Sequence, residues 1–211
     1  AIVFNPSLDS RDLIICAMIT VWALRLGSFL FWRIKKDGQD KRFIVMKTKF
    51  TWFLMTWTIG GLWVLVTMAA GLAALTSNTT AELGLVSYLG IALWLFGFVV
   101  EVTADNQKTE FRKNPDNRNR FIATGVWSWS QHANYFGEIT LWFGMALVAL
   151  PVLSGWQLAT LISPVFVYFL LTKVSGIPLL DRLAKQKWGT DSAYLSYTQA
   201  TSKLLLWPPK T

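Results

Sequence analysis

One stretch of the chain, residues 128–144, carries most of the side chains that could do chemistry. It reads SWSQHANYFGEITLWFG. Helical spacings of three, four and four put four of its polar and aromatic side chains on one face: Gln131, Asn134, Glu138 and Trp142. Tyr135 lies beside that face. Because carboxyl and phenol groups can transfer protons, Glu138 and Tyr135 are the candidate catalytic residues. The alternative is a structural hydrogen-bond cluster between helices, with Glu138 paired to Arg25.

Three ionisable residues, Arg25, Glu101 and Glu138, fall within long apolar segments or near their ends. Charges at membrane depth are costly and are usually retained for a function. All three are placed toward the same leaflet. We therefore expect a polar cavity that opens to one side of the membrane.

A second group of polar residues starts with Glu101 and Asp105, one helical turn apart. A basic run follows: Arg112, Lys113, Arg118 and Arg120. Arginine suits bidentate contacts with phosphate, but a basic loop also binds anionic lipid, and the residues favour neither interpretation. A third group in the tail combines Lys187 and Trp188 with Tyr194 and Tyr197. Its tyrosines could be interfacial anchors or could cap a ligand.

The composition indicates which elements must position these residues. The chain is 53% hydrophobic and 15% charged, against about a quarter charged for a soluble domain. Its apolar residues form blocks near the ~20 residues that cross a bilayer. We predict an all-α, polytopic transmembrane helical bundle, one domain over residues 1–211, with a short interfacial helix beyond Gly176. The five predicted spans are Asp12–Trp32, Thr51–Leu75, Leu83–Thr103, Asn134–Val152 and Trp156–Val174.

The positive charges are sorted between the loops. Eighteen of the twenty Lys and Arg residues lie in Arg33–Lys49, in the loop 104–130, or from Lys173 onward. By the positive-inside rule these segments are cytoplasmic, and so is the C-terminus. The same rule explains the net charge of +8 without a nucleic-acid partner. We expect an integral membrane protein of a bacterial inner membrane or of the endoplasmic reticulum.

Several classes of site are excluded by composition and motifs. The chain has one cysteine and one histidine, His132, so we expect neither a disulfide nor a zinc site. A Rossmann glycine motif after a strand, a phosphate-binding Walker loop and the H-E-x-x-H zinc motif do not occur. Any nucleotide would have to be held among the helices.

Together these elements resemble the steroid 5-alpha-reductase family, in particular its bacterial membrane branch. The residues that carry the resemblance are Trp22 to Leu26 with the basic loop after them, then Asp105, Arg112-Lys113, Arg120, Asn134, Gly137-Glu138 and Trp142. The resemblance implies NADPH in a helical cavity open to the cytoplasm. It also implies hydride transfer to an activated carbon–carbon double bond of a sterol or other lipid-like molecule.

The resemblance implies these cofactor contacts: Glu101, Asp105, Arg112, Arg120, Asn134, Glu138 and Tyr197. It places Trp142, Trp22 and Arg25 near the substrate. Trp22 stands where steroid-reducing members carry a carbonyl-polarising tyrosine, which leaves the proton donor unassigned. Those members also use an acidic residue on an earlier helix. If residues precede Ala1, we expect one or two spans and part of the active site there.

Two rival functions stay open. The run Gln131-His132-x2-Tyr135-x-Gly137 resembles the Arg-His-Pro-x-Tyr-x-Gly run of isoprenylcysteine and phospholipid methyltransferases, which use S-adenosylmethionine. Those enzymes carry paired glutamates in the tail, where this chain has Leu180-Asp181. The third possibility is a non-enzymatic lipid-binding membrane protein. Asp105 with Arg112 and Arg120 favours a phosphate-rich cofactor and thus the reductase. The sequence does not indicate an oligomeric state.

Overall fold

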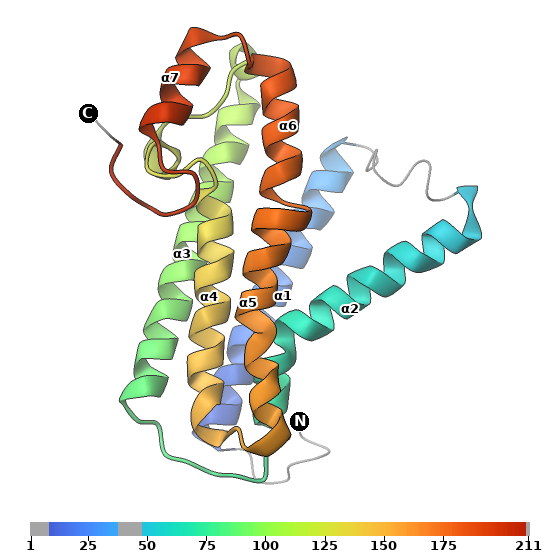
Figure 1. The fold of residues 1–211 in the computed structure, drawn as a ribbon, viewed down its shortest axis with the longest axis vertical. Helices are drawn as coiled ribbons and strands as arrows, with labels where there is room; N and C mark the ends of the chain where they lie inside the picture. Colours follow the sequence, from blue (N-terminus) through green and yellow to red (C-terminus); the bar gives the residue numbers. More distant parts are fainter. Residues whose placement is uncertain (1–8, 38–47, 210–211) are drawn as a thin grey trace. The chain divides into compact units, whose positions relative to one another are not determined.

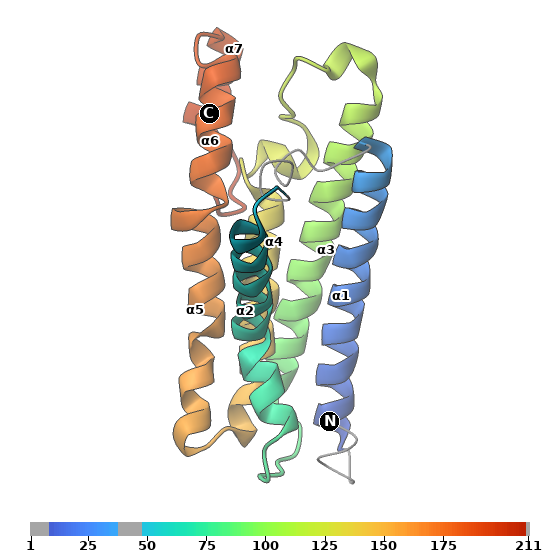
Figure 2. The ribbon, with the colours of Figure 1, turned by 90° about the vertical axis from the view of Figure 1, so that its right-hand side faces the viewer.

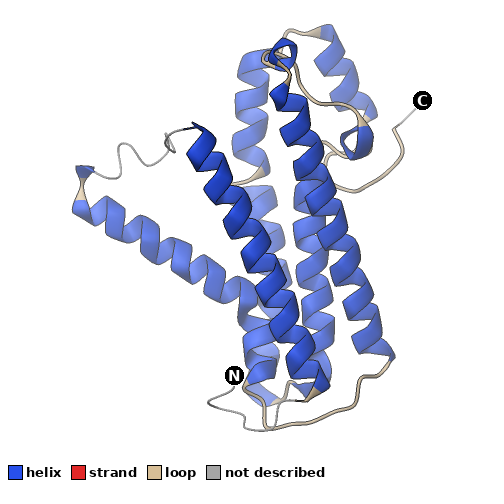
Figure 3. Cartoon of the chain, turned by 180° about the vertical axis from the view of Figure 1, so that it is seen from behind, coloured by secondary structure: helices blue, strands red, loops and turns tan. Residues whose placement is uncertain are grey.

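The structure is a computed structural model that describes residues 9–37 and 48–209. Its seven α-helices are α1 Ser10–Asp37, α2 Phe50–Leu75, α3 Leu85–Lys113, α4 Ala133–Ala149, α5 Ile162–Phe169, α6 Ile177–Trp188 and α7 Ser192–Ala200. The shorter turns are η3 Pro115–Asn117, η4 Gly125–Ser128, η5 Leu150–Val152, η6 Gly155–Leu161 and the π-helix Leu170–Val174. The described ranges contain helices and loops and no strand, as Figure 3 shows. The predicted all-α fold class is confirmed.

Five helical stretches are long and apolar enough to cross a membrane, as predicted: Ser10–Lys35, Phe50–Leu75, Leu85–Lys113, Ala133–Val152 and Gly155–Trp188. The third helix differs from the prediction, which ended its span at Thr103 and began a loop there. α3 continues to Lys113 because the added turns are amphipathic: Ala104 is fully buried and Phe111 packs on the same core.

The tail also differs from the single interfacial helix that the sequence predicts, because it forms two helices. Gly189 follows the last residue of α6. The carboxylate of Asp191 then accepts hydrogen bonds from the backbone N–H groups of Ala193 and Tyr194, at 2.8 and 3.4 Å. This side-chain cap at its N-terminus starts α7 as a separate helix.

The chain divides into two compact units. Unit 1 comprises Ala1–Tyr88 and Met145–Ser163, and unit 2 comprises Leu89–Gly144 and Pro164–Thr211. Each is described by itself below. The prediction of one domain over the whole chain stays a prediction.

In unit 1 a buried arginine joins the elements at one end. The Arg11 side chain is 1% exposed. Its guanidinium donates to the Ser87 hydroxyl at 2.8 Å and to the carbonyls of Glu82, Ala81 and Val148. These acceptors come from the loop before α3, from α3 and from the end of α4. One charged side chain therefore satisfies backbone carbonyls of two segments and a hydroxyl on a third.

Other hydrogen bonds within unit 1 follow the same pattern. The hydroxyl of Ser77 donates to the carbonyl of Val152 at 2.6 Å, and the hydroxyl of Ser163 donates to the carbonyl of Thr67. Gly71 lets α2 approach its neighbours, because a Cβ there would lie 3.2 Å from the sulfur of Met145. Small side chains with hydroxyls that bond backbone carbonyls are typical of packed membrane helices.

In unit 2, α3 and α4 lie side by side (Figure 1), joined along a seam of glycines. A Cβ at Gly97 would lie 2.6 Å from the carbonyl oxygen of Gly137, and a Cβ at Gly144 would lie 2.6 Å from that of Gly90. The two backbones are therefore in direct contact, which only glycine permits. Figure 2 shows α6 continuing the direction of α5 beyond the π-helical turn, with α7 at the far end.

Candidate functional site

The buried polar side chains of unit 2 gather where α3 and α4 meet. Glu101 and Asp105 on α3 are 5% and 8% exposed, and Glu138 and Trp142 on α4 are 9% and 1% exposed. The indole N–H of Trp142 donates to Oε1 of Glu138 at 2.8 Å. The Asn134 amide donates to Oδ1 of Asp105 at 3.3 Å. Four of the predicted cofactor residues, Glu101, Asp105, Asn134 and Glu138, thus come from the same pair of helices.

The glycine seam positions this cluster. A Cβ at Gly137 would lie 2.7 Å from the backbone nitrogen of Glu101. The turn of α4 that carries Glu138 is therefore held against the turn of α3 that carries Glu101. Because the backbones touch, the side chains next to the seam are brought together by rigid helices.

The helix face predicted from the sequence begins one turn later than expected. α4 starts at Ala133, so Gln131 lies in the preceding turn. Its amide donates to the carbonyls of Thr198 and Thr201, at 3.0 and 2.7 Å. Gln131 therefore anchors the tail to the start of α4 instead of continuing the face of Asn134 and Glu138.

A second polar cluster, which sequence reasoning missed, joins the start of α4 to α6 and the tail. His132 is 6% exposed, and its Nε2 lies 3.3 Å from Oδ1 of Asp181. The other carboxylate oxygen of Asp181 accepts from the Lys203 ammonium. The ring of Tyr135, a candidate catalytic residue, stacks on His132 with 5.8 Å between centroids. Burial lowers the pKa of His132, which the nearby carboxylate of Asp181 partly opposes. The sequence singled out His132 and Asp181 only in the comparison with methyltransferases, and no spacing rule joins them, since they are 49 residues apart.

The predicted phosphate-binding arginines lie at the exposed end of α3 and on the loop after it. Arg112 and Arg120 are both exposed. The Arg112 guanidinium donates to the carbonyls of Asn117 and Arg118, each at 3.3 Å. From α6, Lys187 donates to the Arg118 carbonyl at 2.9 Å, and the indole of Trp188 donates to the Asn119 carbonyl at 2.6 Å. The basic loop is thus an ordered part of unit 2, outside the buried carboxylate cluster.

An aromatic group connects this loop to α7. The hydroxyl of Tyr197 donates to the carbonyl of Trp127 at 2.7 Å, and the Trp127 indole donates to the carbonyl of Ala104 at 3.0 Å. The Phe121 ring lies 5.3 Å from that of Tyr197 and 5.2 Å from that of Tyr194. Burial raises the pKa of Tyr197, so its hydroxyl stays protonated. The hydroxyl of this predicted cofactor contact is thus bonded to backbone.

The predicted substrate residues Trp22 and Arg25 belong to α1, in unit 1. Trp22 is 4% exposed. The Arg25 guanidinium lies 5.4 Å from the centroid of the Phe29 ring, a cation–π contact. The pairing of Glu138 with Arg25 stays a prediction. Within the described ranges there is no group of three His, Cys, Asp or Glu side chains that could hold a metal ion.

Comparison with known proteins gives the family. The model of a family described as "Protein of unknown function (DUF1295)" matches residues 1–201. The chain belongs to this family. Among curated proteins, the 3-oxo-5-alpha-steroid 4-dehydrogenase 1 of Bos taurus is 33% identical over 70 residues, which is 33% of this chain and 27% of that protein. The Mus musculus protein of the same name is 31% identical over 77 residues, 36% of this chain and 28% of its own length.

These matches confirm the resemblance to the steroid 5-alpha-reductase family. The matched part of this DUF1295 chain spans little more than a quarter of those two relatives, at 27% and 28% of their lengths. The Homo sapiens protein of that name is 34% identical over 61 residues, 24% of its length. No solved structure matches the chain.

Proposed function

We propose that this chain is a membrane-embedded, NADPH-dependent reductase that acts on an activated carbon–carbon double bond of a sterol or other lipid-like molecule. The observation that carries the proposal is the polar cluster of unit 2, in which carboxylates and an amide come together from α3 and α4, two helices long and apolar enough to cross a membrane. Buried charges of this kind are expensive, and a ligand-binding role accounts for them. The names of the curated relatives support the same reaction class.

The side chains of unit 2 fit the chemistry of a dinucleotide phosphate. Carboxylates and amides suit ribose hydroxyls and a carboxamide, and Glu101, Asp105, Asn134 and Glu138 offer these groups. Arginines suit phosphates, and Arg112 and Arg120 are exposed at the end of α3 and on the loop after it, in the same unit. When bound, NADPH supplies a hydride. We assign to this chain's residues the tasks of holding the cofactor and excluding water.

Glu138 has a defined role in this proposal. The Trp142 indole donates to one carboxylate oxygen and fixes the side chain on α4. A carboxylate has about four acceptor sites, so Glu138 can also accept from a ligand. Trp142 would bring an apolar ring to the same place, next to the substrate. Tyr135, stacked on His132, is the candidate proton donor, with Glu138 as the other candidate.

The proposed orientation follows from charge. The loop after α3 and the tail after α5 carry most of the cations of unit 2, and we place both at the cytoplasmic side. NADPH would then reach the site from the cytoplasm and the lipid-like substrate from the membrane. Labelling of single cysteines introduced at exposed Lys113 and at Ser154 in a Cys16→Ser background tests this orientation, because a membrane-impermeant reagent should reach only one of them in sealed vesicles.

The central test is cofactor binding by the purified chain. NADPH should raise its melting temperature, because a ligand that binds only the folded state stabilises it. Replacing Arg112 and Arg120 by alanine should weaken NADPH binding by about 1–3 kcal/mol each. The control is Lys113→Ala, which removes an exposed cation whose ammonium lies 2.6 Å from Glu110. Equal NADPH affinity in wild type and in the double arginine variant would contradict the phosphate role.

One observation favours the methyltransferase as a second candidate. His132, in the run that resembles a methyltransferase motif, lies 3.3 Å from Asp181, which stands in the tail region where those enzymes carry paired glutamates. If S-adenosylmethionine raises the melting temperature and NADPH does not, the reductase proposal is wrong. If neither does so, the non-enzymatic lipid-binding interpretation gains support.

A further inference from the structure

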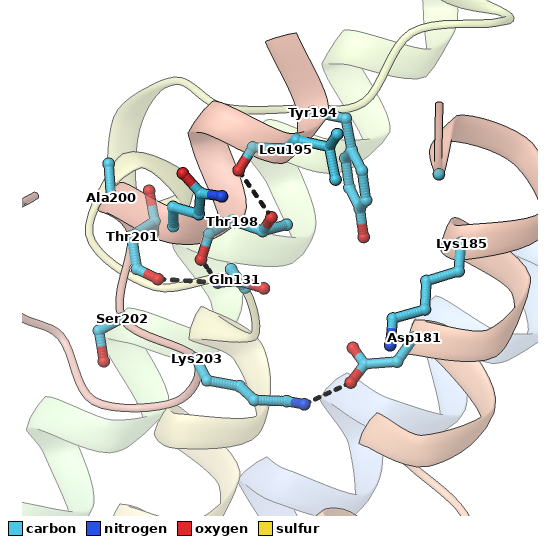
Figure 4. Close-up of a pocket in the computed structure, with 12 residues that line it drawn as sticks. Gln131, Asp181, Lys185, Tyr194, Leu195, Thr198, Ala200, Thr201, Ser202 and Lys203 are labelled. Carbon is cyan, nitrogen blue, oxygen red and sulfur yellow. Dashed lines mark hydrogen bonds and ion pairs between the residues drawn. The ribbon is translucent and has the colours of Figure 1, made fainter. Parts of the chain in front are cut away.

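A pocket of about 600 Å³ lies between α6, α7 and the tail, apart from the proposed cofactor residues. The side chains of Asp181 and Lys185 line it from α6, those of Tyr194 and Thr198 from α7, and those of Ser202 and Lys203 from the tail. Figure 4 shows these side chains around one space. None of the seven predicted cofactor contacts is among the lining residues. Its volume falls in the range of small-molecule sites, about 300–1,000 Å³.

The only carboxylate among the lining residues is already engaged. One oxygen of Asp181 faces Nε2 of His132 at 3.3 Å, and the other accepts from Lys203. The amide of Gln131, which also lines the pocket, is bonded to the Thr198 and Thr201 carbonyls. These bonds order the wall of the pocket and reduce its capacity to attract a cation.

The remaining polar groups are mostly donors. Lys185 brings an ammonium group to the pocket and Ser202 a hydroxyl, and the Lys203 ammonium keeps two further N–H donors beside its bond to Asp181. Tyr194 is held by aromatic contacts with Phe121 and Trp188, at 5.2 and 5.8 Å between centroids, and Figure 4 shows its hydroxyl pointing toward the space beside α6. Burial raises the pKa of Tyr194, which keeps this hydroxyl a donor. Two cations and several hydroxyls around one space match an anion that has several acceptor oxygens.

We propose that this pocket binds a phosphate-bearing ligand, with Lys185 and Lys203 as its charged contacts and Tyr194 and Ser202 as hydroxyl donors. The phosphate could belong to an anionic lipid headgroup or to a soluble phosphate. α6 is compatible with a lipid source, because it exposes Leu179 and Leu183 on a face other than the one that lines the pocket. Those leucines can rest in lipid while Asp181 and Lys185 face the pocket.

The test compares two probes on the full-length purified chain. Inorganic phosphate is titrated in detergent by calorimetry, with sulfate as the competing anion. Nanodiscs of phosphatidylcholine with and without phosphatidic acid then test the lipid source by melting temperature. Lys185→Gln should weaken binding of the active probe roughly ten- to hundredfold, the effect of losing one charge-assisted hydrogen bond. Arg182→Gln removes an exposed cation of the same helix that does not line the pocket, and it should bind like wild type.

Each outcome decides between these sources or against the proposal. If inorganic phosphate binds and Lys185→Gln weakens that binding, the ligand is a soluble phosphate. If only phosphatidic acid raises the melting temperature, and Lys185→Gln removes that rise, the ligand is a lipid headgroup. If neither probe binds, or if Lys185→Gln and Arg182→Gln weaken binding equally, the pocket is not a phosphate site. NADPH binding is measured in the same variants and should be unchanged. If Lys185→Gln weakens NADPH binding as much as phosphate binding, the pocket belongs to the cofactor site and is not a second site.

Discussion

The two units bury their polar side chains in different ways. In unit 1, Arg11, Ser77 and Ser163 donate to backbone carbonyls, so each bond satisfies the main chain of a neighbouring segment. In unit 2, Trp127 and Gln131 also donate to backbone carbonyls, but the polar side chains of the candidate site bond to one another, as in Asn134 with Asp105, Trp142 with Glu138 and His132 with Asp181. A bond to backbone fixes a fold. A pair of side chains can also exchange one partner for a ligand. The bonds to backbone therefore mark a structural region in unit 1, and the side-chain pairs mark a candidate binding site in unit 2.

The largest expected effect tests the structural side of this comparison. Arg11→Met removes a buried guanidinium that donates to Ser87 and to three carbonyls. Because those acceptors stay buried, we expect the free energy of unfolding to fall by about 3 kcal/mol or more. NADPH affinity of the folded protein should be unchanged. Both are measured on purified protein, by detergent denaturation and by titration.

The matched control for Arg11 is Arg33→Met on the same helix. Arg33 is exposed, with its guanidinium 5.9 Å from the centroid of the Phe29 ring. It should change stability by less than about 1 kcal/mol. Equal losses in the two variants would show that burial in the hydrogen-bonded end of unit 1 does not matter.

A smaller effect, but one on both stability and binding, is expected at the glycine seam. Gly137→Ala adds a Cβ that would lie 2.6 Å from the Gly97 carbonyl oxygen and 2.7 Å from the Glu101 nitrogen. Backbone atoms cannot move aside as side chains do, so α3 and α4 must separate. We expect about 1–3 kcal/mol lower stability and weaker NADPH binding, because the seam positions Glu138.

Gly60→Ala on α2 is the control for the seam, since an added Cβ there meets nothing within 4 Å. Alanine favours helix over glycine, so this variant should be as stable as wild type or slightly more so. If Gly137→Ala binds NADPH as tightly as wild type, the glycine seam does not position the cofactor site, and the contrast between the two units does not hold.

The spans could be predicted from the sequence because the bilayer imposes them. Runs of apolar residues near the length of a bilayer crossing leave few alternatives, and all five were found. The burial of Glu138 was also predictable, since a carboxylate on a helix cannot face lipid tails. The run of α3 beyond Thr103 was missed because Asp105 and Lys108 look like loop residues when burial is unknown.

Contacts between distant segments could not be predicted in the same way. His132 and Asp181 are 49 residues apart, and no spacing rule joins them. The Arg11 bonds to the loop before α3 and to α4 are equally non-local, at separations of 70 residues and more. The glycine contacts between α3 and α4 do have a signal in the sequence. Gly90 and Gly97, and likewise Gly137 and Gly144, are seven residues apart, a spacing that keeps both glycines on the face toward a partner helix.

The smallest expected effect concerns pH and applies to unit 2 alone. Burial holds the pKa of His132 below its ordinary value of 6.5, although Asp181 raises it; Lys108 and Lys203 lower it further. The unfolded chain therefore binds a proton more readily than the folded one. The neutral ring's contribution to stability is fully present above pH 6.5, and it is lost as the pH falls from there toward the folded-state pKa.

Melting temperatures across this pH range in wild type and His132→Gln isolate the effect from that of the carboxylates. Wild type should lose stability faster than the variant as the pH falls, and the two curves should run parallel above the ordinary histidine pKa. The Arg11 bonds of unit 1 cannot contribute, because arginine stays protonated and backbone carbonyls do not titrate. Parallel curves over the whole range would mean that His132 is solvated in the folded protein. The side-chain cluster around Asp181 would then be no more sensitive to ligands or protons than the carbonyl-bonded end of unit 1.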